Sequence, residues 1–187
     1  MTTSSTETET DKQPIRVAIV TVSDKAARGQ REDRGGPAVR EALAAGSGGA
    51  QVAVVEYRVV PDEEGVIAEA LYHLSERPDV DLVVTTGGTG LAPRDVTPQA
   101  TRITVEYEVP GIAEAMRAAS LTVTPAAMLS RGIAGVRNRT LIVNLPGSPK
   151  GVEETLAVLM PALPHAIATL RGGVGDHRAP SAPQHGA

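Results

Sequence analysis

The chain has 187 residues, enough for one domain with a sizeable core and too few to expect two. It contains no cysteine, which excludes disulfides, thiolate metal sites and a cysteine nucleophile. The formal net charge of −4 gives no support for a nucleic-acid-binding surface.

The two ends of the chain are expected to be disordered tails on either side of one α/β domain. Residues 1–13 are mostly Thr, Ser, Glu and Asp, and residues 173–187 are rich in Pro, Ala and charged residues. We expect residues 14–172 to form the domain. No apolar run approaches the roughly 18 residues of a membrane span, and the start of the chain lacks the features of a secretory signal. These features favour a cytoplasmic protein without a membrane partner.

The first part of the domain predicts two strands, each followed by a helix. Residues 15–22 are rich in β-branched residues and predict a strand, which is followed by a polar loop over 25–36. A helix is expected over 37–45 and a second strand over about 51–60. Asp62 then lies where the N-cap of the next helix would be, and apolar residues follow it at helical spacing.

A glycine-rich loop follows the next predicted strand. Residues 82–84 form a short apolar run, typical of a strand that is buried on both faces of a parallel sheet. Residues 87–90 contain three glycines, so the backbone can bend sharply and bring its N–H groups close to a ligand. The loop matches neither the P-loop nor the dinucleotide-binding fingerprint. Thr97 and Pro98 then predict a helix start, with the threonine as N-cap.

The last part of the domain predicts one more strand and a long final helix. Thr124 precedes a proline and repeats the Thr-Pro helix start, and residues 140–145 form the last strongly apolar strand. Ser148 is expected to cap a helix whose buried stripe extends to about residue 170. Pro161 and Pro164 lie inside that pattern and predict a kink or a break.

Strands that alternate with helices predict an α/β fold, in which a mostly parallel central sheet lies between two helical layers. Ligands of such sheets bind at the carboxyl ends of the strands. Four unusual stretches directly follow predicted strands, at residues 23–24, 61–62, 87–95 and 146–150. If these strands are parallel, all four stretches meet along one edge of the sheet.

Asp62 and Asp95 are the candidate metal ligands of this edge. A pair of carboxylates beside an anion-binding loop suits Mg²⁺, which keeps several positions for water and phosphate. Asp62 also fits an N-cap, worth about 1 kcal/mol, and the two roles are compatible. Lys150, close to a predicted helix start, either binds an anion or is a solvated first-turn lysine.

Three motifs together resemble the MoaB/Mog family of molybdenum cofactor biosynthesis proteins. They are Thr85-Thr-Gly-Gly-Thr-Gly90, Arg94-Asp-Val-Thr-Pro98 and Leu145-Pro-Gly-Ser-Pro149. The family includes bacterial molybdopterin adenylyltransferases and the G domain of gephyrin, and the similarity extends over about residues 15–172. The resemblance implies a three-layer molybdopterin-binding fold and a homotrimer. It also implies a nucleotidyltransferase reaction, in which AMP passes from ATP to the terminal phosphate of molybdopterin with Mg²⁺ and pyrophosphate is released.

The resemblance also implies roles for individual residues. The two acidic positions that matter in adenylylating members fall on Asp62 and Asp95, as catalytic residues and Mg²⁺ ligands. Substrate binding falls on a larger set of residues at the strand ends: Ser23, Asp24, Thr86, Gly87, Gly88, Thr89, Gly90, Arg94, Pro146, Gly147, Ser148 and Lys150. We expect the glycine loop to hold the nucleotide phosphates. Ser148 and Lys150, with Ser23 and Asp24 opposite, are expected to help bind the pterin.

Two other classes of protein compete with this interpretation. A non-catalytic molybdopterin-binding carrier or regulatory protein would keep the fold and the glycine loop but would form no ATP-dependent product. Homologous domains of molybdenum-insertion enzymes and competence-damage proteins act on other substrates. The intact Arg94-to-Pro98 motif favours the catalytic branch. The expected protein partners of that branch are the molybdenum-insertion enzyme and molybdopterin synthase.

Overall fold

A computed structural model describes residues 13–45 and 51–172, so the expected tails lie outside the described residues apart from Gln13. The strands of the described chain are β1 (Ile15–Val22), β2 (Val52–Val60), β3 (Leu82–Thr86), β4 (Tyr107–Glu108), β5 (Ala134–Arg137) and β6 (Thr140–Leu145). Its helices are α1 (Asp24–Ala27), α2 (Gly35–Ala45), α3 (Glu64–Ser75), α4 (Thr97–Thr104), α5 (Pro110–Leu121), α6 (Pro149–Leu159) and α7 (Leu163–Leu170). Two short 3₁₀ helices are η2 (Pro125–Leu129) and η3 (Met160–Ala162). None of the helices in these ranges has the length and apolar character needed to span a membrane.

The strands form one mixed sheet in the order β2-β1-β3-β6-β5-β4. β2, β1, β3 and β6 are mutually parallel, which confirms the mostly parallel sheet, whereas β5 and β4 extend it in antiparallel fashion. The sequence pattern predicted neither of these two strands. β4 has only two residues, both exposed, and β5 reads Ala-Gly-Val-Arg, which has no clear alternation. Asn138 has φ 53° at the turn between β5 and β6, a left-handed conformation that asparagine tolerates.

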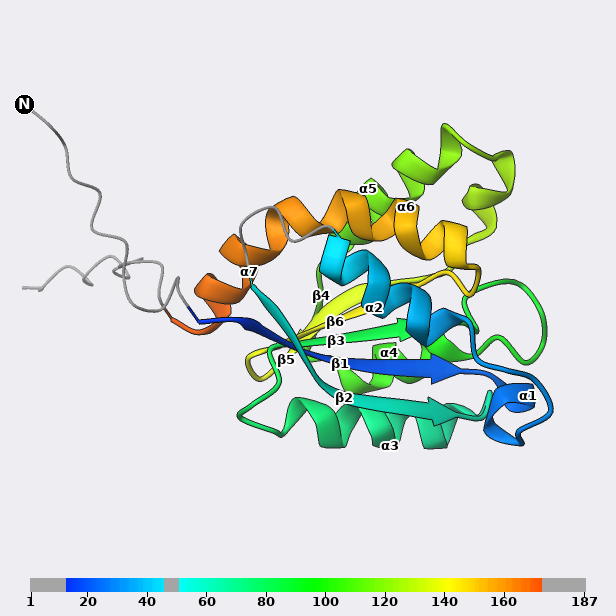
Figure 1. Cartoon of the computed structure of the whole chain (residues 1–187), viewed down its shortest axis with the longest axis horizontal. Helices are drawn as coiled ribbons and strands as arrows, with labels where there is room; N and C mark the ends of the chain where they lie inside the picture. Colours follow the sequence, from blue (N-terminus) through cyan, green and yellow to red (C-terminus); the bar gives the residue numbers. More distant parts are fainter. Residues whose placement is uncertain (1–12, 46–50, 173–187) are drawn as a thin grey trace, which may run out of the picture.

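Helices cover both faces of the sheet, as Figure 1 shows, so the predicted three-layer α/β/α fold is confirmed. Leu82 and Val84 of β3 pack in a core with residues of α2, α5, α6 and α7. Val83 points to the other face and packs with residues of α3 and α4. All three are completely buried, which explains why β3 reads as an unbroken apolar run.

The expected helix starts are partly confirmed. Ser148 accepts a hydrogen bond from Gly151 N at 3.2 Å and caps α6 as predicted. The prolines after Leu159 end α6, and the chain passes through η3 into α7, which confirms the expected break. The polar loop expected over 25–36 was wrong in its first part, because α1 begins at Asp24, capped by Ser23.

Two predicted N-caps were wrong, and both residues contact the strand-end loops instead. The N-cap of α3 is Glu63, with no side-chain hydrogen bond, whereas the Asp62 carboxylate accepts a backbone N–H from α1. Thr97 lies inside α4, and its hydroxyl donates to Gly87 O at 2.9 Å. Both side chains bind residues that lie outside the first turn of the helix, which is as far as a capping pattern extends.

At the amino edge of the parallel strands, Asp81 joins the two ends of the described chain. Its buried carboxylate accepts bonds from the side chains of Arg16 and Arg171 at 2.6 to 3.0 Å. Arg171 also donates to the carbonyls of Gln13 and Pro14. Burial alone would raise the pKa of Asp81, but the hydrogen bonds from the two arginines lower it by more, so its pKa lies well below the ordinary value.

We expect Asp81→Asn to lower the free energy of unfolding by about 3 kcal/mol at pH 7, because two partly buried guanidinium groups lose their counter-charge. Denaturant unfolding measures this change. Asp79→Asn is the matched control: its side chain is half exposed and pairs with Arg77, so its effect should stay within about 1 kcal/mol. Equal effects of the two substitutions would contradict the buried role of Asp81.

The same ion pairs predict a dependence of stability on pH. The pKa of Asp81 in the native protein lies below its unfolded value of about 3.9. The contribution of Asp81 to the free energy of unfolding is therefore complete at pH values above the unfolded pKa. The contribution is lost as the pH falls toward the native pKa. We therefore expect the wild type to lose stability between about pH 5 and pH 2 more steeply than Asp81→Asn does. Parallel pH profiles for the two proteins would rule this out.

Candidate active site

The loops after β1 and β2 are bound to each other at the carboxyl edge of the sheet. Asp24 N donates to Asp62 Oδ2 at 2.7 Å, and Asp62 N donates to Asp24 Oδ1 at 3.2 Å. Arg94, from the loop after β3, donates to both carboxylate oxygens of Asp24 at 2.7 to 3.0 Å. These bonds lower the pKa of the Asp24 carboxyl below its ordinary value, so Asp24 is ionised at neutral pH.

The glycine loop has a backbone that other residues could not easily adopt. Gly87 and Gly88 have φ values of 100° and 64°. A Cβ atom at Gly87 would lie 2.4 Å from Val22 O, and one at Gly88 would lie 2.3 Å from the Thr97 hydroxyl. Thr97 N also donates to Gly88 O at 3.1 Å. The loop is therefore packed between the end of β1 and the start of α4.

The loop after β6 lies against the glycine loop. Thr86 donates its hydroxyl hydrogen to Pro146 O at 2.7 Å, and a Cβ atom at Gly147 would lie 3.2 Å from Gly87 Cα. The four strand-end stretches therefore converge as predicted: the parallel strands in Figure 1 point toward the edge where these loops meet.

Two cavities lie on either side of the glycine loop. The first, of about 590 Å³, contains both candidate carboxylates, and we call it the carboxylate cavity. Its lining includes Ser23, Asp62, Thr86, Gly87, Gly88, Asp95 and Gly147 among the expected site residues, together with Arg31, Asp33 and Arg34. Asp24 and Arg94 line neither cavity, because they bind each other beside the first.

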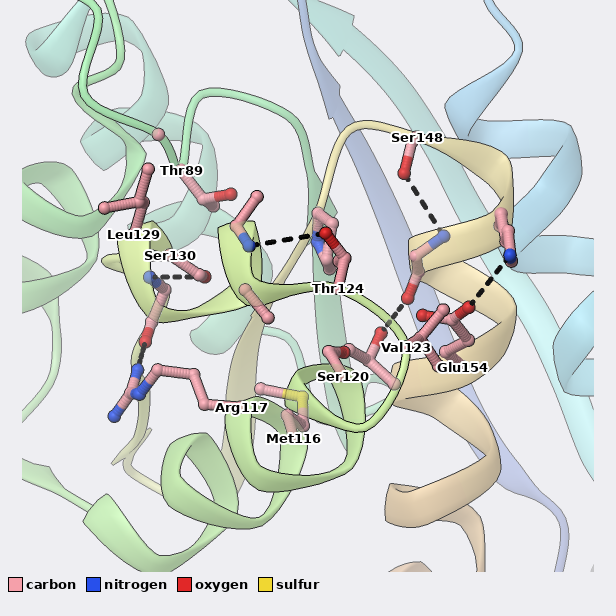
Figure 2. Close-up of a pocket in the computed structure, with 18 of the residues that line it drawn as sticks. Thr89, Met116, Arg117, Ser120, Val123, Thr124, Leu129, Ser130, Ser148 and Glu154 are labelled. Carbon is pink, nitrogen blue, oxygen red and sulfur yellow. Dashed lines mark hydrogen bonds and ion pairs between the residues drawn. The ribbon is translucent and has the colours of Figure 1, made fainter.

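The second cavity, of about 500 Å³, we call the apolar cavity. Expected site residues in its lining are Thr89, Gly90, Pro146, Ser148 and Lys150. Met116, Val123 and Leu129, from α5 and the segment around η2, surround the opening in Figure 2. Lys150 is largely exposed, and its Nζ lies 3.8 Å from a carboxylate oxygen of Glu154, one turn further along α6.

Asp62 and Asp95 both line the carboxylate cavity, and carboxylate oxygens are of the type that Mg²⁺ takes as ligands in proteins. Asp62 Oδ2 accepts from Asp24 N, and Asp95 Oδ2 accepts from Ala92 N at 2.9 Å. In the described parts of the chain, Oδ1 of each aspartate has no hydrogen-bond partner. Those parts hold no group of three or more acidic, histidine or cysteine ligands, and Mg²⁺ sites that share phosphate oxygens need only one or two carboxylates.

The sequence pattern did not predict several of the lining residues. Asp33, in the loop between α1 and α2, accepts from the N–H groups of Gly35 and Gly36, and from the hydroxyls of Thr21 and Tyr57. It therefore shapes the carboxylate cavity rather than offering a free oxygen. The position of Asp33 in the polar segment between β1 and α2 was an available signal. The residues of α5 and η2 follow no strand of the edge, so that argument could not find them.

The fold and its two adjoining cavities define an α/β protein with a candidate ligand site at the carboxyl edge of its parallel strands. A family model described as a probable molybdopterin binding domain matches residues 18–165, and the chain belongs to that family. The resemblance to MoaB and Mog proteins is thus confirmed.

Individual relatives agree with this assignment. The molybdopterin adenylyltransferase of Helicobacter pylori (strain J99) is 41% identical over 86% of this chain and 90% of its own length. The Escherichia coli K12 protein of the same name is 44% identical over 76% of this chain and 72% of its own. The crystal structure of the molybdopterin biosynthesis enzyme MoaB from Thermus thermophilus is 53% identical, with a TM-score of 0.77, and the match covers 84% of this chain and 97% of that one.

We expect Gly87→Ala to destabilise the protein by about 2 kcal/mol or more, because it combines positive φ with a close approach to a backbone oxygen. Thermal and denaturant unfolding measure the effect. Gly65→Ala is the matched control, since a Cβ atom there meets nothing within 4 Å and α3 favours alanine. The assignment of strain to the loop fails if both variants are equally stable.

Proposed function

We propose that this protein is a molybdopterin adenylyltransferase, which transfers AMP from ATP to the terminal phosphate of molybdopterin. The observation that carries the proposal is the meeting of Asp62, Asp95 and the glycine loop in one cavity, beside a second, apolar cavity. Two substrates that react with each other need two adjoining sites. The names of the relatives in Helicobacter pylori and Escherichia coli support the same reaction.

We assign the carboxylate cavity to ATP. The N–H groups of the glycine loop and the cationic side chains of Arg31 and Arg34 suit a chain of phosphates. Asp62 and Asp95 would hold Mg²⁺, which when bound neutralises charge on the phosphates. Ser23 lines this cavity, so we place it on the nucleotide side rather than with the pterin.

We assign the apolar cavity to molybdopterin. Met116, Val123 and Leu129 offer apolar surface to a flat heterocycle, and Ser148 and Lys150 offer a hydroxyl and a charge to its phosphate. Thr89 and Gly90 line this cavity while Gly87 and Gly88 line the other, so the glycine loop separates the two reactants by one loop's width.

In the reaction, an oxygen of the terminal phosphate of molybdopterin attacks the α-phosphorus of ATP. The bond from that phosphorus to the oxygen bridging to the β-phosphate breaks, and pyrophosphate leaves with the electron pair. Both reactants are anions, so the protein must overcome their repulsion. Its work is positioning and charge neutralisation, which the loop N–H groups and the cations of the two cavities provide.

We expect Asp62→Asn and Asp95→Asn each to reduce pyrophosphate release by about 100-fold or more, because each removes charge that organises the transferring phosphate. The assay supplies ATP, Mg²⁺ and molybdopterin, and binding of molybdopterin should be largely kept. Asp79→Asn, at the opposite edge of the sheet, serves as the control and should keep normal turnover.

Two results would overturn parts of this proposal. Tight molybdopterin binding by the wild type without pyrophosphate release would identify a non-catalytic carrier or regulatory protein. Near-normal turnover by Asp95→Asn would remove that residue from the site. The homotrimer, the cytoplasmic location and the expected partners, the molybdenum-insertion enzyme and molybdopterin synthase, stay predictions. Sedimentation of the purified chain would test the homotrimer.

A further inference from the structure

Arg131 lies in the segment that joins η2 to β5, and neither cavity is lined by its side chain. The sequence pattern predicts no role for this residue. It nevertheless lies against the loop that carries Asp95. Its half-buried side chain and its backbone both bind that loop.

Arg131 makes its contacts with backbone carbonyls of the loop only. Its backbone N–H donates to Thr89 O at 2.9 Å, its Nε donates to Gly90 O at 2.7 Å, and its Nη2 donates to Asp95 O. The guanidinium therefore spans from the second half of the glycine loop to the candidate metal ligand. Within the described residues no carboxylate pairs with it, so its charge is not committed to an ion pair.

The loop between these acceptors is also held by the Arg94 side chain, which donates to the Asp24 carboxylate. Leu91, Ala92, Pro93 and Arg94 are exposed, and Asp95 is tied to the turn by its exchange of hydrogen bonds with Ala92. At the far end of the loop, Thr97 binds the carbonyls of Gly87 and Gly88. Arg131 and Thr97 thus fix the loop together with the Arg94–Asp24 ion pair, and of these side chains Arg131 is the one that binds the Asp95 carbonyl.

We propose that Arg131 is a positioning residue, which sets the Asp95 carboxylate relative to Asp62 and the glycine loop relative to both cavities. The effect on the reaction rate expected from this inference rests on the proposed function, whereas the effect on the position of the loop does not. A lysine cannot replace the arginine, because its single ammonium group does not hold two donors in the fixed directions of the Gly90 and Asp95 carbonyls.

The test compares the wild type with Arg131→Lys and Arg131→Gln. Arg137→Lys is the matched control, since Arg137 also donates to a backbone carbonyl, that of Thr104, but is the last residue of β5, opposite the first residue of β6. The rate of pyrophosphate release and its dependence on Mg²⁺ concentration are measured for each. Hydrogen exchange of the backbone amides over residues 88–97, followed by mass spectrometry, gives a second readout that needs no activity.

We expect both Arg131 variants to lose about 100-fold in kcat, the loss that a displacement of about 1 Å can cause. The Mg²⁺ concentration for half-maximal rate should rise, because Asp95 no longer stands where it meets the ion. Exchange should be faster over residues 88–97 while β1 and α3 keep wild-type rates. The Arg137 control should show none of these changes.

Other outcomes overturn the inference. If Arg131 only stabilised the fold, its loss would speed hydrogen exchange throughout the chain. The molecules that remain folded would then keep the wild-type Mg²⁺ concentration for half-maximal rate. Wild-type exchange over residues 88–97 in both variants would show that Arg131 does not hold the loop. If the wild type itself releases no pyrophosphate, the proposed function fails, and the exchange experiment alone then decides whether Arg131 positions the Asp95 loop.

Discussion

The common direction of β2, β1, β3 and β6 is the constraint on which the site depends. Because these four strands are parallel, the polar stretch after each one is delivered to the same edge, although the stretches are separated by up to 120 or so residues of chain. Hydrogen bonds between neighbouring loops then fix their relative positions: Asp24 with Asp62, and Thr86 with Pro146. The core on each face serves this arrangement by holding the strands in register.

Much of this could be predicted from the sequence because the signals are local. An apolar run followed by glycine, proline or aspartate identifies a strand end wherever it occurs, and Ser148 caps α6 through a residue only three positions away. β4 and β5 could not be predicted, because they are short and gain their partners only within the assembled sheet. The apolar cavity was missed for a similar reason: α5 brings its lining residues from outside the strand ends.

Asp62 shows how a local sequence pattern can predict the wrong partner for a side chain. Its position before α3 favours an N-cap, yet its carboxylate accepts an N–H from α1, 38 residues away. Thr97 behaves in the same way, since its hydroxyl binds the glycine loop rather than its own helix. At these two positions, side chains of a type that usually caps a helix bind a neighbouring loop instead. Arg131 extends that pattern, because it binds only carbonyls of the loop.

The contact between Arg171 and the carbonyls of Gln13 and Pro14 has a different kind of consequence. It places the last described helix beside the start of β1, at the amino edge and so on the side of the sheet opposite the two cavities. Both of these points therefore lie away from the carboxyl edge. A connection engineered between them, or to another domain at either one, would be made on the side of the sheet opposite the two cavities.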